Sequence, residues 1–272
     1  MPSDKINRPI GIFDSGVGGL TVVAEIFRYL PNENIVYFGD VIRTPYGGRP
    51  KETIINFARQ DVRLLLEHKV KYIIVACNSA SAVALDILRS EFEIEILGVI
   101  GPGARAAVEA TKNGRIGIIG TKATISSDSY ARELQALDKD IKVFSLACPL
   151  FVPLAEEGYI DKEATRLIAE DYLTALINLD IDTLVLGCTH YPLLRNVIGK
   201  VMGDKVRLID SAESTAQLVN QILTDNNLKR ESNRDITHKF YVSDVPDKFS
   251  QIAERFLGRQ INNITRVDIT RY

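Results

Sequence analysis

Two segments of the chain resemble each other, and each of them contains a cysteine followed by polar residues. Residues 70–79 read VKYIIVACNS and residues 181–190 read IDTLVLGCTH. In both, a run of aliphatic and β-branched residues leads into Cys77 or Cys188, which is the pattern of a buried strand that carries a thiol at its end. A cysteine accepts a proton as thiolate and returns it as thiol. One thiol in each half suits a reaction that acts on both faces of one small substrate.

The residues that follow the two thiols differ. Cys77 precedes an amide and a hydroxyl, whereas Cys188 precedes a hydroxyl and then His190. The start of a helix just beyond each cysteine would lower the pKa of its thiol below about 8.5 and favour the thiolate. From the residues alone, His190 either exchanges a proton with Cys188 or is hydrogen bonded locally. The other polar positions are Asn78 and Ser79 on the first side and Thr189 on the second.

A packing role is the alternative for each cysteine, because free cysteine is among the most buried residue types. Two matched cysteines with polar neighbours favour chemistry for Cys77 and Cys188. Cys148 precedes Pro149 in an apolar run and is predicted to be structural. Three cysteines do not form a disulfide framework, and three histidines without a close cluster of ligands predict that no metal is bound.

A glycine-rich turn follows the first apolar run. Residues 14–19 read DSGVGG, and the backbone N–H groups of such a turn suit a carboxylate or a phosphate. The turn lacks the last glycine of a dinucleotide fingerprint, although Asp40 stands where a ribose-binding acid would. Asp14 is either a helix N-cap or a reactive acid. A second turn at 45–48 is expected on the same edge, where Tyr46 and exposed backbone would hold a substrate.

Short apolar runs alternate with amphipathic stretches, and these elements must position the residues above. Strands that are apolar at nearly every position and separated by helices predict a parallel sheet covered on both faces, that is, an α/β fold. Ligands bind such sheets beyond the carboxyl ends of the strands, where the thiols and the glycine turn are expected. The predicted strands are 10–14, 34–39, 72–76, 95–99, 115–119, 141–146, 183–187 and 206–209, with one more at 238–243.

The similarity between the halves extends beyond the cysteines. Residues 10–15 match residues 116–121 at an offset of 106, residues 34–38 resemble residues 140–144 at the same offset, and the two cysteines are 111 residues apart. One such match is typical of any two buried strands, but three in the same order indicate a duplicated unit. We therefore predict two similar Rossmann-like or flavodoxin-like parallel-sheet domains related by a pseudo-twofold axis, with the active site in the cleft between them.

Composition predicts where the domains divide. Glycine and proline cluster at residues 98–103 and indicate the boundary between the two domains there. The first domain is predicted to comprise residues 1–99 and 212–272, and the second to comprise residues 100–211. A helix around 214–224 would return the chain to the first domain, the polar residues 225–238 would form a surface loop, and a helix around 246–257 would lie in the tail.

Bulk properties exclude several classes of protein. The chain has 272 residues, of which 46% are hydrophobic and 25% charged, as in a globular protein. A net charge of −2 and a pI of about 6.0 predict no nucleic-acid partner. The N-terminus lacks the apolar segment of a signal peptide, and no apolar run approaches the roughly 20 residues of a membrane span. A cytoplasmic protein without membrane contact is expected.

These motifs together make the chain resemble the cofactor-independent aspartate/glutamate racemases, and among them the glutamate racemases. The resemblance covers about residues 8–223 and is weaker over the tail. The pair of cysteine motifs is specific, whereas the glycine turn alone is not. The motifs are DSGVGGL at 14–20, PYG at 45–47, ACNSA at 76–80, FVPL at 151–154 and GCTHYP at 187–192.

The resemblance implies an isomerase that makes D-glutamate for peptidoglycan, uses no cofactor and forms a homodimer. By analogy with the family, Cys77 and Cys188 are the two acid/base thiols. Asp14 assists the first thiol, and His190 with a glutamate assists the second. The substrate-binding residues implied by the family are Asp14, Ser15, Tyr46, Gly47, Asn78, Ser79, Thr121, Thr189 and His190.

The family pattern also bears on the assisting glutamate and on the residue that follows Asn78. The assisting glutamate is placed at Glu156, because related sequences carry an acid directly after the Val-Pro-Leu-x run, and Glu157 is the alternative. The family usually has Asn-Thr after the first cysteine, whereas this chain has Ser79, which keeps the hydroxyl and loses a methyl group.

The implied chemistry agrees with the residue types. Racemisation removes the α-proton from one face and returns a proton to the other, so two opposed thiols need not cross the substrate. No lysine motif for pyridoxal phosphate is apparent, so N–H and hydroxyl donors in a site closed to water would stabilise the carbanion.

Aspartate racemase is the nearest alternative function. A thiol hydrolase or transferase leaves one cysteine unexplained, and a non-catalytic α/β module that binds a carboxylate is the alternative from another class.

Overall fold

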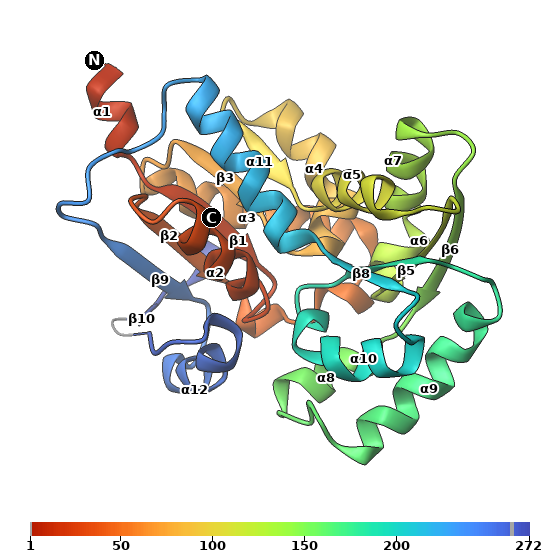
Figure 1. Ribbon diagram of the computed structural model, residues 1–272. Coiled ribbons are helices and arrows are strands. Elements are labelled where there is room, and N and C mark those ends of the chain that lie inside the picture. Colours follow the sequence, from red (N-terminus) through yellow and green to blue (C-terminus); the bar gives the residue numbers. More distant parts are fainter. Residues whose placement is uncertain (1, 262–263) are drawn as a thin grey trace.

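Strands form two parallel sheets in the computed structural model, which describes residues 2–261 and 264–272 (Figure 1). The first sheet has the order β10-β9-β2-β1-β3-β4 and the second the order β6-β5-β7-β8. The first comprises β1 (Ile10–Asp14), β2 (Ile35–Gly39), β3 (Tyr72–Val75), β4 (Ile96–Gly98), β9 (His238–Val242) and β10 (Ile264–Arg266). The second comprises β5 (Arg115–Gly120), β6 (Lys142–Ala147), β7 (Thr183–Gly187) and β8 (Arg207–Asp210).

Both sheets contain the same four-strand arrangement. The series β2-β1-β3-β4 and β6-β5-β7-β8 have equivalent chain order. Ile10 pairs with Tyr72 in the first sheet and Ile116 pairs with Thr183 in the second, so the register repeats at the offsets of 106 and 111 seen in the sequence. The predicted α/β fold with two similar parallel sheets is confirmed, and equivalent strands end at equivalent edges.

Helices cover both faces of the first sheet. Successive side chains of a strand point to opposite faces, so Ile12 packs with one group of helices and Phe13 with the other. The first group is α2 (Leu20–Tyr29), α11 (Ser211–Asp225) and α12 (Pro246–Leu257). The second group is α3 (Lys51–Glu67) and α4 (Asn78–Glu91).

The second sheet is covered in the same way. On one face lie α5 (Ile100–Ala110) and α7 (Ser129–Leu137), and on the other lie α8 (Phe151–Glu156), α9 (Glu163–Ile177) and α10 (Arg195–Met202). The remaining helices are short: α1 (Pro2–Asn7), α6 (Lys122–Ser126), and the 3₁₀ helices η1 (Val41–Arg43), η2 (Tyr46–Gly48), η3 (Tyr191–Leu194) and η4 (Ile269–Arg271). One apolar cluster continues from α2 and α11 to α8 and α9 and joins the two halves.

The predicted strands agree with the structure to within one or two residues, while several other elements differ. Helix α11 begins at Ser211 instead of 214, because the Asp210 carboxylate caps it by accepting from the Ala212 N–H at 2.9 Å. Residues 226–237 contain no helix or strand, as expected of a loop, but Arg230 within them is buried. Neither α1 nor the three-residue β10 was predicted from the sequence.

Residues 98–103, where the boundary between the domains is predicted, run from the end of β4 into the first turn of α5. Gly101, Pro102 and Gly103 lie in the first turn of α5, where proline costs no hydrogen bond because those N–H groups have no partner within the helix. A Cβ at Gly103 would lie 3.0 Å from the Ser211 Cβ, so glycine permits α5 to approach the start of α11. The chain therefore passes between the sheets through a helix.

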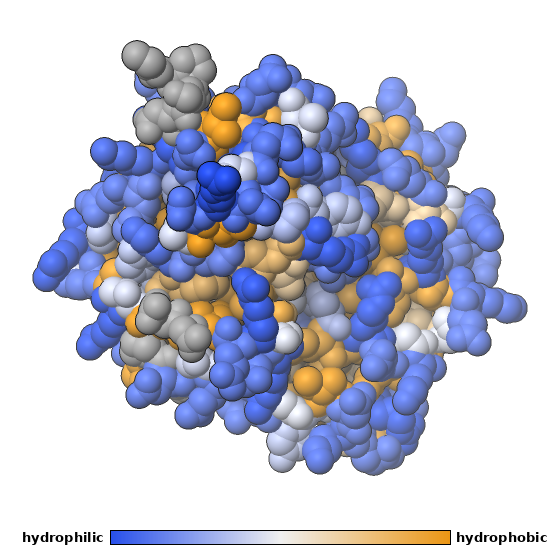
Figure 2. Space-filling model, turned by 60° about the vertical axis from the view of Figure 1, so that its left-hand side comes forward, coloured by the Kyte–Doolittle hydropathy of each residue, from blue (hydrophilic) through white to orange (hydrophobic). Residues whose placement is uncertain are grey.

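The surface is largely polar. Figure 2 shows hydrophilic residues over most of the face in view, with apolar residues in separate groups between them. Within the described part of the chain, no helix combines the length and the apolar character that a membrane crossing requires.

Candidate active site

The carboxyl ends of β1 and β3 meet those of β5 and β7 where the two halves join. Ser79 Oγ of the first half is 2.8 Å from Thr121 Oγ1 of the second. Thr189 Oγ1 of the second half donates to Asp14 Oδ1 of the first at 3.5 Å. In each contact, a residue at the end of the first strand of one half (β1 or β5) lies against a residue that follows the third strand of the other half (β7 or β3). The structure thus brings both cysteine motifs into one buried site, which also contains Ser15.

Glycines permit this close approach. A Cβ at Gly18 would lie 2.3 Å from Thr189 Oγ1 and 2.6 Å from His190 Nδ1. A Cβ at Gly47 would lie 2.4 Å from the Thr121 Cβ. Both distances are far inside van der Waals contact, so any side chain there would push the halves apart. The glycine turn therefore has a role that its sequence did not indicate, which is to let the first half touch the second cysteine motif.

Cys188 lies against a hydrogen-bonded pair of ionisable side chains. Its Sγ is 3.8 Å from His190 Nδ1, and His190 Nε2 is 2.9 Å from Glu156 Oε1. Burial disfavours the charged imidazole, but the hydrogen bonds with Cys188 and Glu156 outweigh it and raise the pKa of His190 to about 10. An imidazolium at this position attracts negative charge on the sulfur. The glutamate in contact is Glu156, whereas Glu157 is exposed.

Cys77 has a different environment. It occupies the N-cap position of α4. Burial and the Asp14 carboxylate raise the pKa of Cys77 to about 12, against weaker hydrogen bonds from the Ala80 N–H and the Ser15 hydroxyl. The prediction that the helix start lowers the pKa of this thiol is wrong for this structure, because burial and a negative neighbour outweigh the helix N-terminus. Cys77 is a neutral thiol here.

Asp14 does not cap a helix. The N-cap residue of α2 is Gly19, and the Asp14 Oδ2 instead accepts from the Gly16 N–H at 3.0 Å. The carboxyl group is fully buried, and burial raises the pKa of Asp14 above its usual value. The N-cap interpretation is therefore wrong for α2, and the role of Asp14 as a reactive acid stays a prediction.

Asn78 carries a donor without a protein partner. Its Oδ1 accepts from the Tyr130 hydroxyl at 2.8 Å, while its Nδ2 is buried and has no hydrogen-bond partner within the described residues. A buried N–H₂ group without a partner costs about 1–3 kcal/mol. A carboxylate bound beside Cys77 would remove that cost, which makes this side chain suitable for substrate binding.

The hydroxyl of Tyr46, a residue predicted to hold the substrate, is engaged by other side chains. Its side chain is fully buried, and its hydroxyl hydrogen bonds with Asp40 and, at 3.0 Å, with Asp61. The phenol is therefore committed to these carboxylates, and the contribution of the 45–48 turn is through Gly47, which lies against Thr121. The same contacts occupy one oxygen of Asp40, which is also paired with Arg43, and so argue against a ribose-binding acid.

The tail contributes residues that the sequence did not predict for the site. The ring of Phe256 in α12 lies edge-on to the His190 imidazole, with centroids 5.3 Å apart. Arg255 Nη1 donates to the backbone oxygen of Glu156 at 2.8 Å. Apolar spacing in 246–257 predicts a helix, but spacing does not indicate against which element a helix packs. Helix α12 therefore supports the Glu156–His190 pair across the junction.

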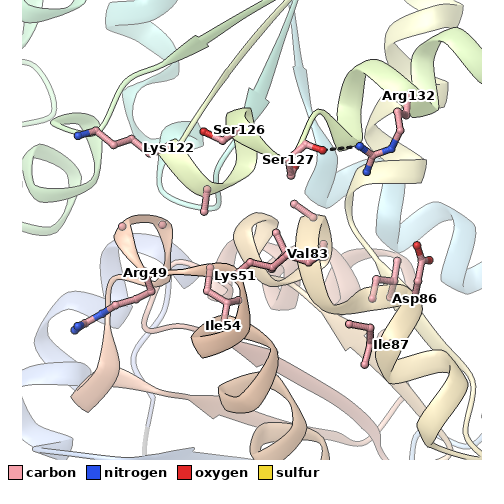
Figure 3. Close-up of a pocket in the computed structure, with 16 residues that line it drawn as sticks. Arg49, Lys51, Ile54, Val83, Asp86, Ile87, Lys122, Ser126, Ser127 and Arg132 are labelled. Atoms are coloured by element: carbon pink, nitrogen blue, oxygen red, sulfur yellow. Dashed lines mark hydrogen bonds between the residues drawn. The ribbon is translucent and has the colours of Figure 1, made fainter.

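A separate cavity of about 570 Å³ lies between the halves, and neither thiol lines it (Figure 3). It borders Gly47, the middle of α4 and helix α6. In Figure 3, Arg49 and Lys122 extend to one side of the view, and Arg132 donates to the Ser127 backbone oxygen. Its basic side chains do not converge on one point, so the arrangement does not define a second anion site.

Fold and site together define a class: an α/β protein of two similar parallel-sheet halves that place one thiol each in a shared, buried site. Within residues 2–261 and 264–272, no group of three or more His, Cys, Asp or Glu side chains is placed to hold a metal ion.

Comparison with known proteins gives the family. Residues 34–219 match the model described as Asp/Glu/Hydantoin racemase. The chain is 47% identical to the glutamate racemase of Geobacter metallireducens over 262 residues, which cover 96% of this chain and 97% of the relative. The structure of a glutamate racemase isoform from Bacillus anthracis matches with a TM-score of 0.92 at 43% identity, over 96% of this chain and 97% of that chain. The chain belongs to the Asp/Glu/hydantoin racemase family.

A second solved structure extends the comparison. Glutamate racemase from Francisella tularensis, solved in complex with D-glutamate, matches with a TM-score of 0.92 at 38% identity, over 98% of this chain and all (100%) of that chain. The predicted enzyme class, an amino-acid racemase, is confirmed by these relatives.

Proposed function

We propose that the protein interconverts L- and D-glutamate by passing the α-proton between Cys77 and Cys188 without a cofactor. One observation carries the proposal: two thiols stand at equivalent strand ends of two similar halves, and each has its own acid or base partner. The glutamate racemase relatives support glutamate as the substrate.

The mechanism requires one thiolate and one thiol at the start of each turnover. His190, held as an imidazolium by Glu156, places a positive charge 3.8 Å from the Cys188 sulfur, and the raised pKa of Cys77 keeps that group protonated. Cys188 then removes the α-proton from one face while Cys77 donates a proton to the other. This turnover leaves Cys188 as the thiol and Cys77 as the thiolate, and the opposite direction starts from that state with the roles exchanged.

The α-proton is weakly acidic, so the developing negative charge needs donors. Asn78 Nδ2, without a partner in the described residues, is suited to the substrate carboxylate. The hydroxyls of Ser15, Ser79, Thr121 and Thr189 surround the same site, and all are buried. A site closed to water strengthens each of these interactions.

The product D-glutamate would supply peptidoglycan synthesis in the cytoplasm, and the enzyme would act as a homodimer. Residues 1–99 with 212–272 would move as one body against residues 100–211 to admit and enclose the substrate.

Solvent exchange tests the reaction directly. Incubation with L-glutamate in D₂O, without added cofactor, is expected to give D-glutamate with deuterium at Cα, measured by NMR and chiral chromatography. Failure to exchange the α-proton of either enantiomer would exclude racemisation. L-aspartate in the same assay is expected to exchange far more slowly, and faster exchange of aspartate would make the protein an aspartate racemase.

A further inference from the structure

Tyr130 lies where the two cysteine motifs come together. Its ring belongs to α7 of the second half and is 2% exposed. Its hydroxyl donates to Oδ1 of Asn78, the residue after Cys77, at 2.8 Å. A Cβ at Gly187, the residue before Cys188, would lie 3.2 Å from the Tyr130 ring. One buried side chain is therefore in contact with a neighbour of each thiol.

The Tyr130 phenol also lies beside α5 and α11, the two segments through which the chain passes between the halves. A Cβ at Gly103 in α5 would lie 3.3 Å from the Tyr130 oxygen. Ser211, the first residue of α11, also interacts with the Tyr130 hydroxyl. The chain leaves the first half through α5 and returns to it through α11, so the phenol lies beside both of these segments.

The hydrogen bond to Asn78 fixes which end of the amide is free. Because Oδ1 accepts from Tyr130, Nδ2 is turned away from the phenol, to a buried place where it has no partner in the described part of the chain. Without this bond the amide would rotate to satisfy its donor elsewhere, since an unpaired buried N–H₂ is unfavourable. The hydroxyl of Tyr130 thereby keeps a donor available beside Cys77.

We infer that Tyr130 is a positioning residue, whose hydroxyl orients the Asn78 carboxamide so that Nδ2 donates to the substrate carboxylate. Tyr130 does not itself touch the substrate. The inference rests on the proposed racemase function, and it adds a link from the junction of the halves, through Tyr130, to a substrate donor.

Equilibrium binding tests this link. Racemic glutamate is titrated by calorimetry, because turnover of the racemate produces no net change. Tyr130→Phe keeps the ring and removes the hydroxyl, and it is expected to weaken binding roughly three- to tenfold, the value of one hydrogen bond. In an Asn78→Ala background the same substitution is expected to have no further effect, because the group that it orients is absent. Equal effects in both backgrounds would overturn the inference, as would unchanged binding by Tyr130→Phe.

The kinetic constants of Tyr130→Phe, compared with those of a variant at the neighbouring residue, distinguish a positioning role from general destabilisation of the fold. Tyr130→Phe is expected to raise KM for both enantiomers more than it lowers kcat. Ser129→Ala is the matched control: Ser129 Oγ donates to the Ala82 backbone oxygen at 2.7 Å, again from α7 to α4. It is expected to leave binding and KM unchanged. An equal rise of KM in Ser129→Ala would reduce Tyr130 to a structural role.

A measurement on the wild-type protein covers the case in which Tyr130→Phe does not fold. The Nδ2 protons of Asn78, assigned by NMR with ¹⁵N-labelled asparagine, are expected to exchange slowly with water and to shift when glutamate is added. Rapid exchange without a shift would overturn the inference. Failure of the proposed function is distinguishable, because it shows as absent turnover of the wild-type enzyme in D₂O.

Discussion

At the scale of single residues, the two thiols are equivalent in position and unequal in environment. Cys188 faces an imidazolium, which favours negative charge, whereas Cys77 faces the Asp14 carboxylate, which opposes it. The two thiols of the ligand-free protein therefore have neighbours of opposite charge. A symmetric pair would lack this difference, and two thiolates in one buried site would repel each other.

Replacing either thiol should stop racemisation while leaving a partial reaction. Cys77→Ser and Cys188→Ser are each expected to lower kcat/KM about 10²–10⁴-fold, the usual contribution of a general acid or base. The equilibrium constant of racemisation is one, so kcat/KM must fall equally in both directions. Residual α-proton exchange in D₂O is expected for one enantiomer in each variant, and for opposite enantiomers in the two. Exchange of the same enantiomer by both variants would contradict the two-base assignment.

The pKa of His190 predicts how stability depends on pH. This pKa is about 10 in the folded protein against an ordinary 6.5, so the folded state binds the proton more tightly. The resulting stabilisation is complete below about pH 6.5 and is lost as the pH rises through about 10. Urea unfolding of wild type and His190→Gln at several pH values is expected to show a difference that shrinks over this range. A constant difference would mean that His190 is neutral in the fold.

At the scale of elements, the site depends on how closely backbone segments of one half approach the other. The sequence showed glycines in the turn at 14–19 and suggested an anion-binding loop. The structure shows Gly18 against the segment that follows Cys188. Spacing along one segment does not indicate which distant segment it will contact, so this function of the glycine was not predictable.

Gly18→Ala tests that contact. The added Cβ would displace Thr189 or His190, and a displacement of about 1 Å at a catalytic group costs on the order of 10²-fold in rate. We expect kcat/KM for L-glutamate to fall by about that factor. Gly101→Ala is the control, because nothing lies within 4 Å of a Cβ there, and it is expected to keep full activity. Near-normal activity of Gly18→Ala would show that the halves are more widely separated during turnover.

In the molecule as a whole, a buried ion pair ties the chain after α11 to the first sheet. Lys71 and Glu33 are both buried, with Nζ and Oε2 2.7 Å apart. Lys71 also donates to the Leu228 backbone oxygen at 2.7 Å, and Glu33 accepts from the Arg230 N–H at 2.8 Å. The polar segment predicted as a surface loop is thus partly internal, because buried charges need these partners.

Breaking this pair should destabilise the protein. Lys71→Met leaves Glu33 buried without its counter-ion, and the free energy of unfolding is expected to fall by about 3–5 kcal/mol. The exposed pair of Arg59 with Glu91 provides the control, and Arg59→Met is expected to cost less than about 1 kcal/mol. Denaturant unfolding measures both. Similar small losses for the two variants would contradict a larger contribution from the buried pair.

The strands, the parallel α/β class, the duplication and the polar residues at the strand ends could be predicted without the structure, because hydrophobic periodicity and repeated segments are local properties. The sequence also indicated Cys77, Cys188, Asp14 and His190 as residues for chemistry. The tertiary structure decided which groups these side chains meet. The neutral state of Cys77, the buried phenol of Tyr46, the Phe256 contact with His190 and the Tyr130 contact with Asn78 all depend on burial and on neighbours distant in sequence. Electrostatics and packing act through space, so no spacing along the chain could have revealed them.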